Sequence, residues 1–159
     1  MDKAEDTPLR RLGKLGLSLP TPVPPVGAYA SVTRARAGDL VFTSGQVPLD
    51  NGRLIAVGRL GGEVSTAVGR ACARQCALNA LAAVDAALGG LASVTGVVKA
   101  TVYIAATTAF ADHPEVADGA TDLLIAVLGE SARPARSAVG VTSLPLGAPV
   151  ELELILTTA

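Results

Sequence analysis

The chain has 159 residues, of which thirteen are Lys or Arg and fourteen are Asp or Glu, so its formal net charge is −1 and its length fits one domain. Because the basic residues are scattered, the composition does not support a nucleic-acid-binding surface, and no nucleic acid partner is expected. Apolar runs are broken before the roughly 20 residues that a membrane span needs, and the charged N-terminus lacks a signal core, so we expect a cytoplasmic protein without membrane contact.

The first elements are a short helix and a proline-rich arm. Residues 7–15 place Leu9, Leu12 and Leu15 on one side of the predicted helix. Residues 20–25 contain four prolines, each of which lacks an N–H and restricts the residue before it. This segment can be neither helix nor central strand, so we expect an extended arm on the surface.

A hairpin and a long helix come next. Residues 29–34 and 40–44 predict two strands, joined by a polar connection that ends near Gly38. Apolar side chains then recur at helical spacing over residues 65–88, and Gly89-Gly90 is expected to end this helix.

The second half predicts a strand at 97–106, a helix from Asp112 to about 128, and closing strands at 136–141 and 150–157. The order β-β-α-β-α-β-β indicates an α+β fold in which two helices cover one face of a sheet. These strands are apolar at most positions, so both faces of the sheet require burial. We therefore expect a homo-oligomer.

Cysteine and histidine give no sign of a metal centre. Cys72 and Cys76 are four apart on the long helix, and the single histidine, His113, is distant in the sequence. Helical geometry does not favour a disulfide here, and a metal would need more ligands. The glycines within 58–62 lack the spacing and downstream lysine of a phosphate loop. We expect two buried cysteines, no metal and no cofactor.

Arg136, Glu151 and Glu153 stand in the apolar C-terminal runs. Buried charges are costly unless a partner or a ligand satisfies them. One interpretation is a structural ion pair between Arg136 and either glutamate on adjacent strands. The other interpretation is a ligand site, in which the two glutamates share one sheet face because they are two residues apart.

Several segments together resemble one known family. The matching residues are Gly27-Ala28-Tyr29, Leu40-Val41-Phe42-Thr43-Ser44-Gly45-Gln46-Val47-Pro48, Ala73-Arg74-Gln75 with Asn79, Val98-Lys99-Ala100-Thr101-Val102-Tyr103-Ile104, Pro134-Ala135-Arg136-Ser137, Leu144-Pro145 and Val150-Glu151-Leu152-Glu153. They are similar to the RidA/YjgF family of reactive-intermediate deaminases, also called the L-PSP endoribonuclease family.

The resemblance implies a chorismate-mutase-like α+β fold and a homotrimer with a ligand pocket at each subunit interface. Residues 27–159 correspond to the family domain. Residues 1–26 form an N-terminal extension, which is typical of a longer subgroup.

The resemblance also implies a chemistry. Deaminases of the family hydrolyse enamine and imine products of pyridoxal-phosphate enzymes to 2-keto acids and ammonia. The catalytic positions implied for this chain are Arg136, which would bind the substrate carboxylate, and Glu151, which would position or activate water.

Four further positions are implied to bind substrate. The backbone N–H of Gly45 would face the ligand carboxylate, and Tyr29 would line the pocket with Ser44 beside it. Ala138 stands where the family often has a cysteine, which leaves only its backbone to contact the ligand. A helix asparagine of the family has no clear counterpart, since residues 116–119 occupy its neighbourhood.

The first hypothesis is a hydrolase that converts 2-imino acids to 2-keto acids and ammonia. The alternatives are a non-catalytic trimer that binds a small carboxylate as a sensor or scaffold, and an endoribonuclease or translation inhibitor. The near-neutral charge and the scarcity of aromatic residues argue against a groove for single-stranded RNA.

Overall fold

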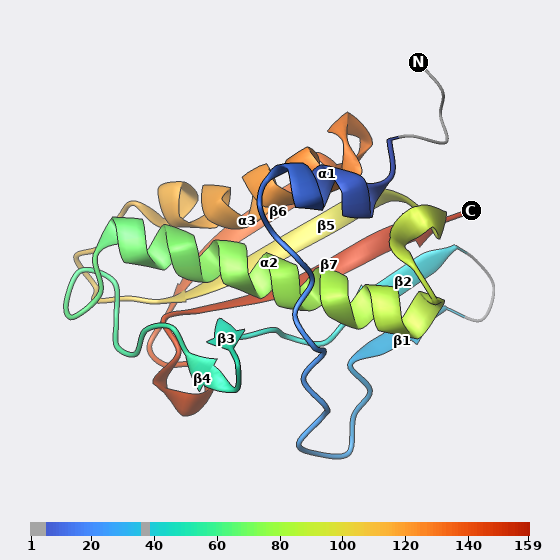
Figure 1. The fold of residues 1–159 in the computed structure, drawn as a ribbon. Coiled ribbons are helices and arrows are strands. Elements are labelled where there is room, and N and C mark those ends of the chain that lie inside the picture. The colour runs from blue at the N-terminus through green and yellow to red at the C-terminus, as the bar shows by residue number, and fades with distance from the viewer. Residues whose placement is uncertain (1–5, 36–38) are drawn as a thin grey trace.

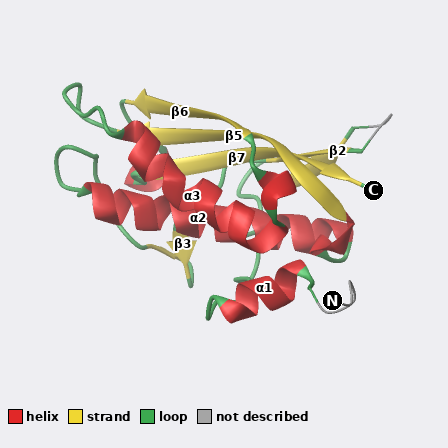
Figure 2. Ribbon diagram, turned by 90° about the horizontal axis from the view of Figure 1, so that it is seen from above, coloured by secondary structure: helices red, strands yellow, loops and turns green. Residues whose placement is uncertain are grey.

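In the computed structural model, residues 6–35 and 39–159 are described, so the expected connection near Gly38 and the first five residues lie outside this description. A five-stranded sheet forms one layer and helices form the other (Figures 1 and 2). The main elements are α1 (Pro8–Lys14), β1 (Val32–Arg34), β2 (Leu40–Thr43), β3 (Leu49–Asp50), β4 (Arg53–Leu54), α2 (Thr66–Leu88), β5 (Val94–Ala105), α3 (His113–Leu128), β6 (Ala135–Val141) and β7 (Val150–Thr158). Three short 3₁₀ turns complete the chain: η1 (Leu91–Ser93), η2 (Glu130–Ala132) and η3 (Pro145–Gly147).

The sheet is mixed and has the order β1-β2-β7-β5-β6. Strand β7 is antiparallel to both β2 and β5, whereas β5 and β6 are parallel and are connected through α3. Both α2 and α3 lie on the same face of the sheet (Figure 2). The predicted α+β class and the order of the main elements are thereby confirmed.

A small hairpin, β3–β4, was not expected from the sequence. Its two-residue turn consists of Asn51 with φ 48° and Gly52 with φ 78°. Two positive φ angles are the requirement of a type I′ turn, for which Asn-Gly is the preferred pair. The flanking strands are only two residues long, which is why the alternation of apolar residues gave no signal.

The helix ends follow local capping chemistry in α2 but not in α3. The Ser65 hydroxyl accepts a hydrogen bond from the Val68 N–H at 3.3 Å, and Gly89 ends α2 with φ 72°. Asp112 occupies the N-cap position of α3, where the sequence predicts the start of this helix, but its side chain accepts no capping hydrogen bond.

The core lies between the helix layer and the sheet. Its largest fully buried members include Leu81, Leu124 and Leu154. Cys72 and Cys76 are buried as expected, and burial raises the pKa of the Cys72 thiol to about 11.

Helix α1 is part of this packing rather than a separate tail. Leu12 is only 1% exposed and belongs to the hydrophobic core. The helix lies on the outer side of the helix layer, next to α3 (Figure 2). Burial of Leu12 therefore fixes the start of the proline-rich arm, which continues from α1 toward β1 (Figure 1).

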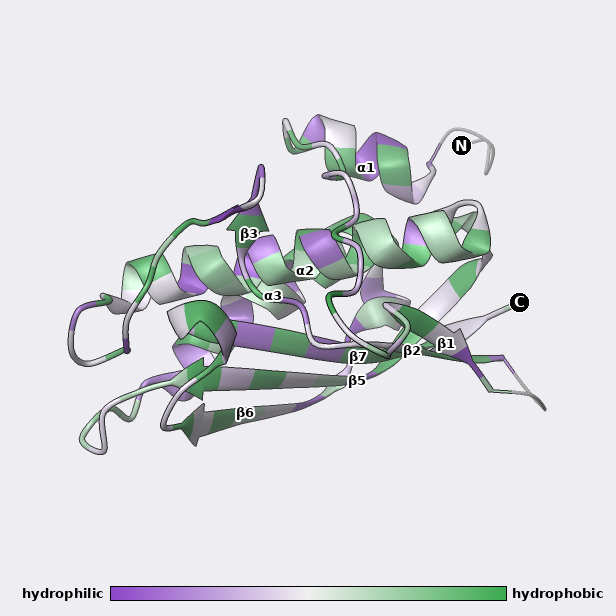
Figure 3. Ribbon diagram, turned by 90° about the horizontal axis from the view of Figure 1, so that it is seen from below, coloured by the Kyte–Doolittle hydropathy of each residue, from purple (hydrophilic) through white to green (hydrophobic). Residues whose placement is uncertain are grey.

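The second face of the sheet is more polar than expected. Along β7 every second residue is buried, and the intervening positions are partly exposed. Figure 3 shows this alternation of hydrophobic and hydrophilic residues on β5 and β7. We call the face that carries Thr101, Tyr103, Glu151 and Glu153 the open face, because no helix covers it. The expectation of two apolar faces is therefore wrong for the centre of the sheet.

Within residues 6–35 and 39–159, no helix is long and apolar enough to cross a bilayer.

Candidate functional site

The loop after β2 lies directly against the start of β7. Gln46 and Leu152 exchange two backbone hydrogen bonds of 2.8 and 3.0 Å, which hold Gly45 beside Glu151. A Cβ on Gly45 would overlap the Oε1 atom of the Glu151 carboxylate. The absence of a Cβ at Gly45 therefore leaves room for the Glu151 carboxylate in this position.

The Glu151 carboxylate is half-buried and makes no hydrogen bond or ion pair with any residue of the described ranges. Burial raises the pKa of this group, and the nearby charge of Glu153 raises it further. An unpartnered carboxylate with a raised pKa is a candidate for proton transfer or for orienting water.

A cleft of about 410 Å³ opens in front of Gly45 and Glu151. The proline-rich arm, the loop after β2 and the η3 turn enclose it, and its lining residues are Val23, Pro24, Pro25, Val26, Tyr29, Ser31, Gly45, Gln46, Val47, Leu49, Pro145, Leu146 and Glu151. Most of these side chains are apolar. The cleft thus has hydrocarbon walls and one carboxylate, which suits a small ligand with a polar group at one end.

Tyr29 makes a contact within the arm, and Ser44 joins the end of β2 to the segment that precedes β1. The Tyr29 hydroxyl accepts a hydrogen bond from the Val26 N–H at 3.3 Å, while its ring lines the cleft. The Ser44 hydroxyl donates to the Ala30 carbonyl at 2.6 Å, and the Ser44 N–H donates to the Ser31 carbonyl at 2.8 Å. Ser44 therefore lies behind the cleft wall and does not line it.

Leu146 stands at the same cleft in an unusual backbone conformation. Its φ is +61°, in the left-handed region that bulky residues rarely adopt, and its side chain is 72% exposed. Such a conformation persists where surrounding structure imposes it, and strained residues of this kind cluster at functional sites.

Two amides on α2 support the wall formed by residues 47–49, a role that the sequence did not assign. Asn79 is 4% exposed, and its Nδ2 donates to the carbonyls of Val47 at 2.9 Å and Leu49 at 3.0 Å. Gln75 Nε2 donates to the Leu49 carbonyl and to Asn79 Oδ1, both at 3.1 Å. The available signal was two amide residues spaced i, i+4 on an otherwise small and apolar helix.

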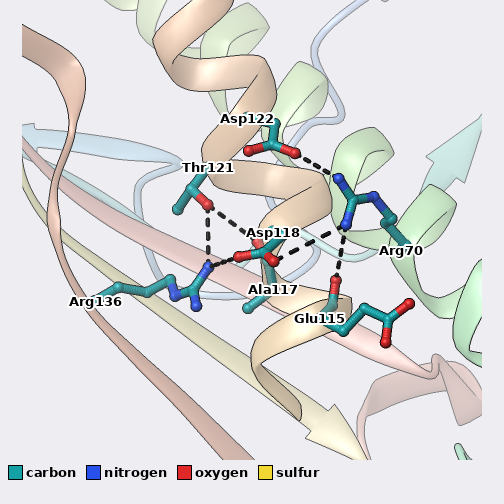
Figure 4. Close-up of polar contacts among 7 residues, drawn as sticks. All are labelled: Arg70, Glu115, Ala117, Asp118, Thr121, Asp122 and Arg136. Atoms are coloured by element: carbon teal, nitrogen blue, oxygen red, sulfur yellow. Dashed lines mark hydrogen bonds and ion pairs between the residues drawn. The ribbon is translucent and has the colours of Figure 1, made fainter. Parts of the chain in front are cut away.

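Arg136 lies on the other side of the sheet. It pairs with Ala100, which in turn pairs with Leu154, so its side chain shares the helix-covered face. Its Nη1 donates to Asp118 Oδ1 at 2.7 Å and to Thr121 Oγ1 at 3.1 Å (Figure 4). The ion pair considered with Glu151 or Glu153 does not form, because strand alternation directs those side chains to the open face.

Ala138 shares the face of Arg136 and packs against the edge of the core. The expected site residues therefore fall into two groups within one chain. Gly45, Glu151 and Tyr29 meet at the cleft, with Ser44 behind it. Arg136 and Ala138 lie on edge strand β6 at the helix-covered face.

The open face carries further polar contacts. The Tyr103 hydroxyl donates to Glu153 Oε1 at 2.9 Å, and this hydrogen bond to the carboxylate is the main reason that the pKa of Tyr103 is raised. Lys99 Nζ donates to Ser137 Oγ at 2.7 Å. In the part of the chain that the structure describes, no group of three His, Cys, Asp or Glu side chains could hold a metal ion.

Residues 21–158, which include the cleft and strand β6, match the sequence model of the endoribonuclease L-PSP family. The chain belongs to this family. The YjgF/RidA family indicated by the sequence motifs is therefore confirmed, and the YjgF gene product of Escherichia coli has the same fold, with 26% identity and a TM-score of 0.62 over 88% of this chain and 94% of that one.

Two other proteins are more similar to this chain in sequence, and a third is about as similar as the YjgF gene product. Protein TCP17 of Trypanosoma cruzi is 38% identical over 91% of this chain and 90% of its own length. The structure of Atu1372 from Agrobacterium tumefaciens, a protein of unknown function, is 37% identical with a TM-score of 0.88 over 97% of this chain and 93% of its own. TdcF of E. coli, whose structure contains bound serine, is 25% identical with a TM-score of 0.63 over 89% and 96%.

Proposed function

We propose that this L-PSP family protein is a hydrolytic deaminase of reactive 2-imino acids. The observation that supports this function is the unpartnered Glu151 carboxylate, which lies over Gly45 at the polar end of an apolar cleft. In the proposed reaction, this carboxylate orients a water molecule toward the imine carbon and accepts its proton. As the C–O bond forms, Glu151 passes this proton to the imine nitrogen, which gives a carbinolamine. Glu151 then transfers the carbinolamine hydroxyl proton to the same nitrogen, so the C–N bond breaks to give a 2-keto acid and ammonia.

The substrate carboxylate needs a cationic partner, and Arg136 is the candidate. Because Arg136 and Glu151 lie on opposite faces of one sheet, one subunit cannot bring them together. We therefore propose a homotrimer in which strand β6 of one subunit, with Arg136 and the backbone of Ala138, completes the cleft of the next. That TdcF, with the same fold, has been solved with bound serine supports a ligand that contains a carboxylate.

The test couples the purified protein to a pyridoxal-phosphate-dependent threonine dehydratase in the presence of semicarbazide. Semicarbazide traps the released imine, so an active deaminase slows semicarbazone formation. Glu151→Gln should abolish this effect. Glu130→Gln is the matched control, because Glu130 pairs only with Arg133 on the surface. Semicarbazone formation at the buffer rate with the wild-type protein would refute the proposal.

A second candidate, binding of a small carboxylate without turnover, is favoured by two observations. Ala138 gives the site no thiol, and Arg136 is already held in place by protein partners. Thermal stabilisation by 2-ketobutyrate in a protein that does not accelerate imine loss would support this candidate. RNA degradation that persists in both Arg136→Ala and Glu151→Gln proteins would arise from another site or from a contaminant.

A further inference from the structure

We propose that Asp118 is a positioning residue for Arg136: it fixes the guanidinium so that the Nε and Nη2 edge is presented to the carboxylate of a monoanionic ligand. This inference rests on the proposed function, because it assigns the orientation of the residue that would bind the substrate carboxylate. The sequence motifs pointed to the neighbourhood of residues 116–119 but assigned no role to Asp118.

The contacts of Arg136 are confined to one end of its guanidinium. Nη1 donates to Asp118 Oδ1 at 2.7 Å and to Thr121 Oγ1 at 3.1 Å, and these two acceptors come from one turn of α3. Nε and Nη2 make no hydrogen bond with any residue in the described ranges. These two nitrogens form the edge that binds a carboxylate through two parallel hydrogen bonds.

Asp118 is itself held from the opposite side. Its Oδ2 lies 4.0 Å from Nη1 of Arg70, which comes from α2 and also contacts Asp122 (Figure 4). The four side chains alternate in charge in the order Asp122, Arg70, Asp118 and Arg136. Asp118 therefore lies between two cations, with one carboxylate oxygen toward Arg136 and the other toward Arg70.

The close approach of the α2 and α3 backbones brings these four side chains near one another. A Cβ on Gly119 would overlap the Arg70 carbonyl oxygen, so only glycine allows α2 and α3 to approach this closely. The side chain of Arg136 is 23% exposed and comes from β6, an edge strand of the sheet.

Two consequences follow for a ligand. An arginine held in place in the free protein loses less side-chain freedom on binding, which strengthens binding of a carboxylate. The negative charge of Asp118 also disfavours a second carboxylate near Nη1, since like charges at close range repel. The structure thus assigns the site to monocarboxylates rather than dicarboxylates.

The experiment measures calorimetric affinity for 2-ketobutyrate, which does not depend on turnover. Asp118→Ala should weaken binding about tenfold, because a hydrogen bond to a charged group is lost. Asp118→Asn retains the oxygen acceptor and should bind within about threefold of wild type. Asp118→Asn, but not the wild type, should also bind 2-ketoglutarate, a dicarboxylate. A purely structural role would not produce this change in ligand choice.

Glu130→Gln is the matched control, since it also removes one negative charge but Glu130 pairs with Arg133 and not with Arg136, and its affinity should equal that of the wild type. The thermal midpoint of each variant verifies folding. Wild-type affinity in Asp118→Ala, with binding lost in Arg136→Ala, would overturn only the role of Asp118. Wild-type affinity in Arg136→Ala, or the absence of binding to the wild-type protein, would overturn both this inference and the proposed carboxylate site.

Discussion

Arg136 and Glu151, which lie on opposite faces of the sheet, differ in whether protein groups pair with their charges. On the helix-covered face, the Nη1 end of the Arg136 guanidinium is paired with Asp118 and Thr121, and Asp118 also lies near Arg70. On the open-face side, Glu151 has no partner among the described residues, and its pKa is raised by burial and by Glu153. A charge within an apolar strand can therefore mean either a completed ion pair or an unsatisfied group. Only the unsatisfied group adjoins an apolar cleft, which is why we place the chemistry there.

The largest expected effect comes from disrupting the helix-covered face at Gly119. In Gly119→Ala, the new Cβ would overlap the Arg70 carbonyl, and backbone in two packed helices cannot easily move aside. We expect a loss of about 3 kcal/mol in the free energy of unfolding, measured by urea denaturation. Gly13→Ala is the control, because a Cβ at Gly13 meets no atom within 4 Å. Equal stability of Gly119→Ala and wild type would contradict the close helix contact.

Gly45→Ala tests the same kind of overlap beside Glu151, which lies on the open face of the sheet. Here the obstructing atom belongs to the end of a flexible side chain, so Glu151 can rotate away at little cost in stability. Under the proposed function, turnover should fall about 100-fold because the carboxylate no longer orients water. Imine hydrolysis and the thermal midpoint should be measured on the same sample. Unchanged turnover would show that the Glu151 position seen over Gly45 is not needed.

Asn79→Ala tests how much the hydrogen bonds from α2 to the cleft wall contribute to stability. The change leaves the carbonyls of Val47 and Leu49 without this donor, and we expect a loss of about 2 kcal/mol in the free energy of unfolding. Gln75→Ala should cost less, because Gln75 donates only one hydrogen bond to that wall. Urea denaturation of both variants measures these losses. A loss in Gln75→Ala equal to or larger than that in Asn79→Ala would contradict the prediction.

The smallest effect is a pH dependence of stability. The folded-state pKa of Glu151 lies above the ordinary value of 4.5, so the folded protein binds this proton more tightly than the unfolded chain. The contribution of Glu151 to stability is therefore greatest at low pH and falls as the pH rises from about 4.5 through the raised pKa. Glu151→Gln should have a slightly higher thermal midpoint than wild type at pH 7 and no advantage at pH 4. Parallel curves over this range would argue against a raised pKa.

Local sequence determined the element order of this protein. Residues 65–88 read as one helix because apolar spacing, the Ser65 cap and Gly89 all act within a few residues, and α2 spans Thr66–Leu88. The segments from residue 27 onward that resemble known family members were also sufficient to indicate the family. The β3–β4 hairpin was missed because its strands are too short for an alternating pattern, although the Asn51-Gly52 turn was visible.

The tertiary structure alone decided which charged residues meet. Arg136 and Asp118 are 18 residues apart in the sequence, and their contact depends on the parallel pairing of β6 with β5 under α3. A shift of one residue in that register would exchange the two faces of the strand and turn Arg136 toward the open face. No local pattern sets this register, since it results from packing between distant segments. The sequence thus identified the charged residues of the candidate site, and the fold assigned them their partners.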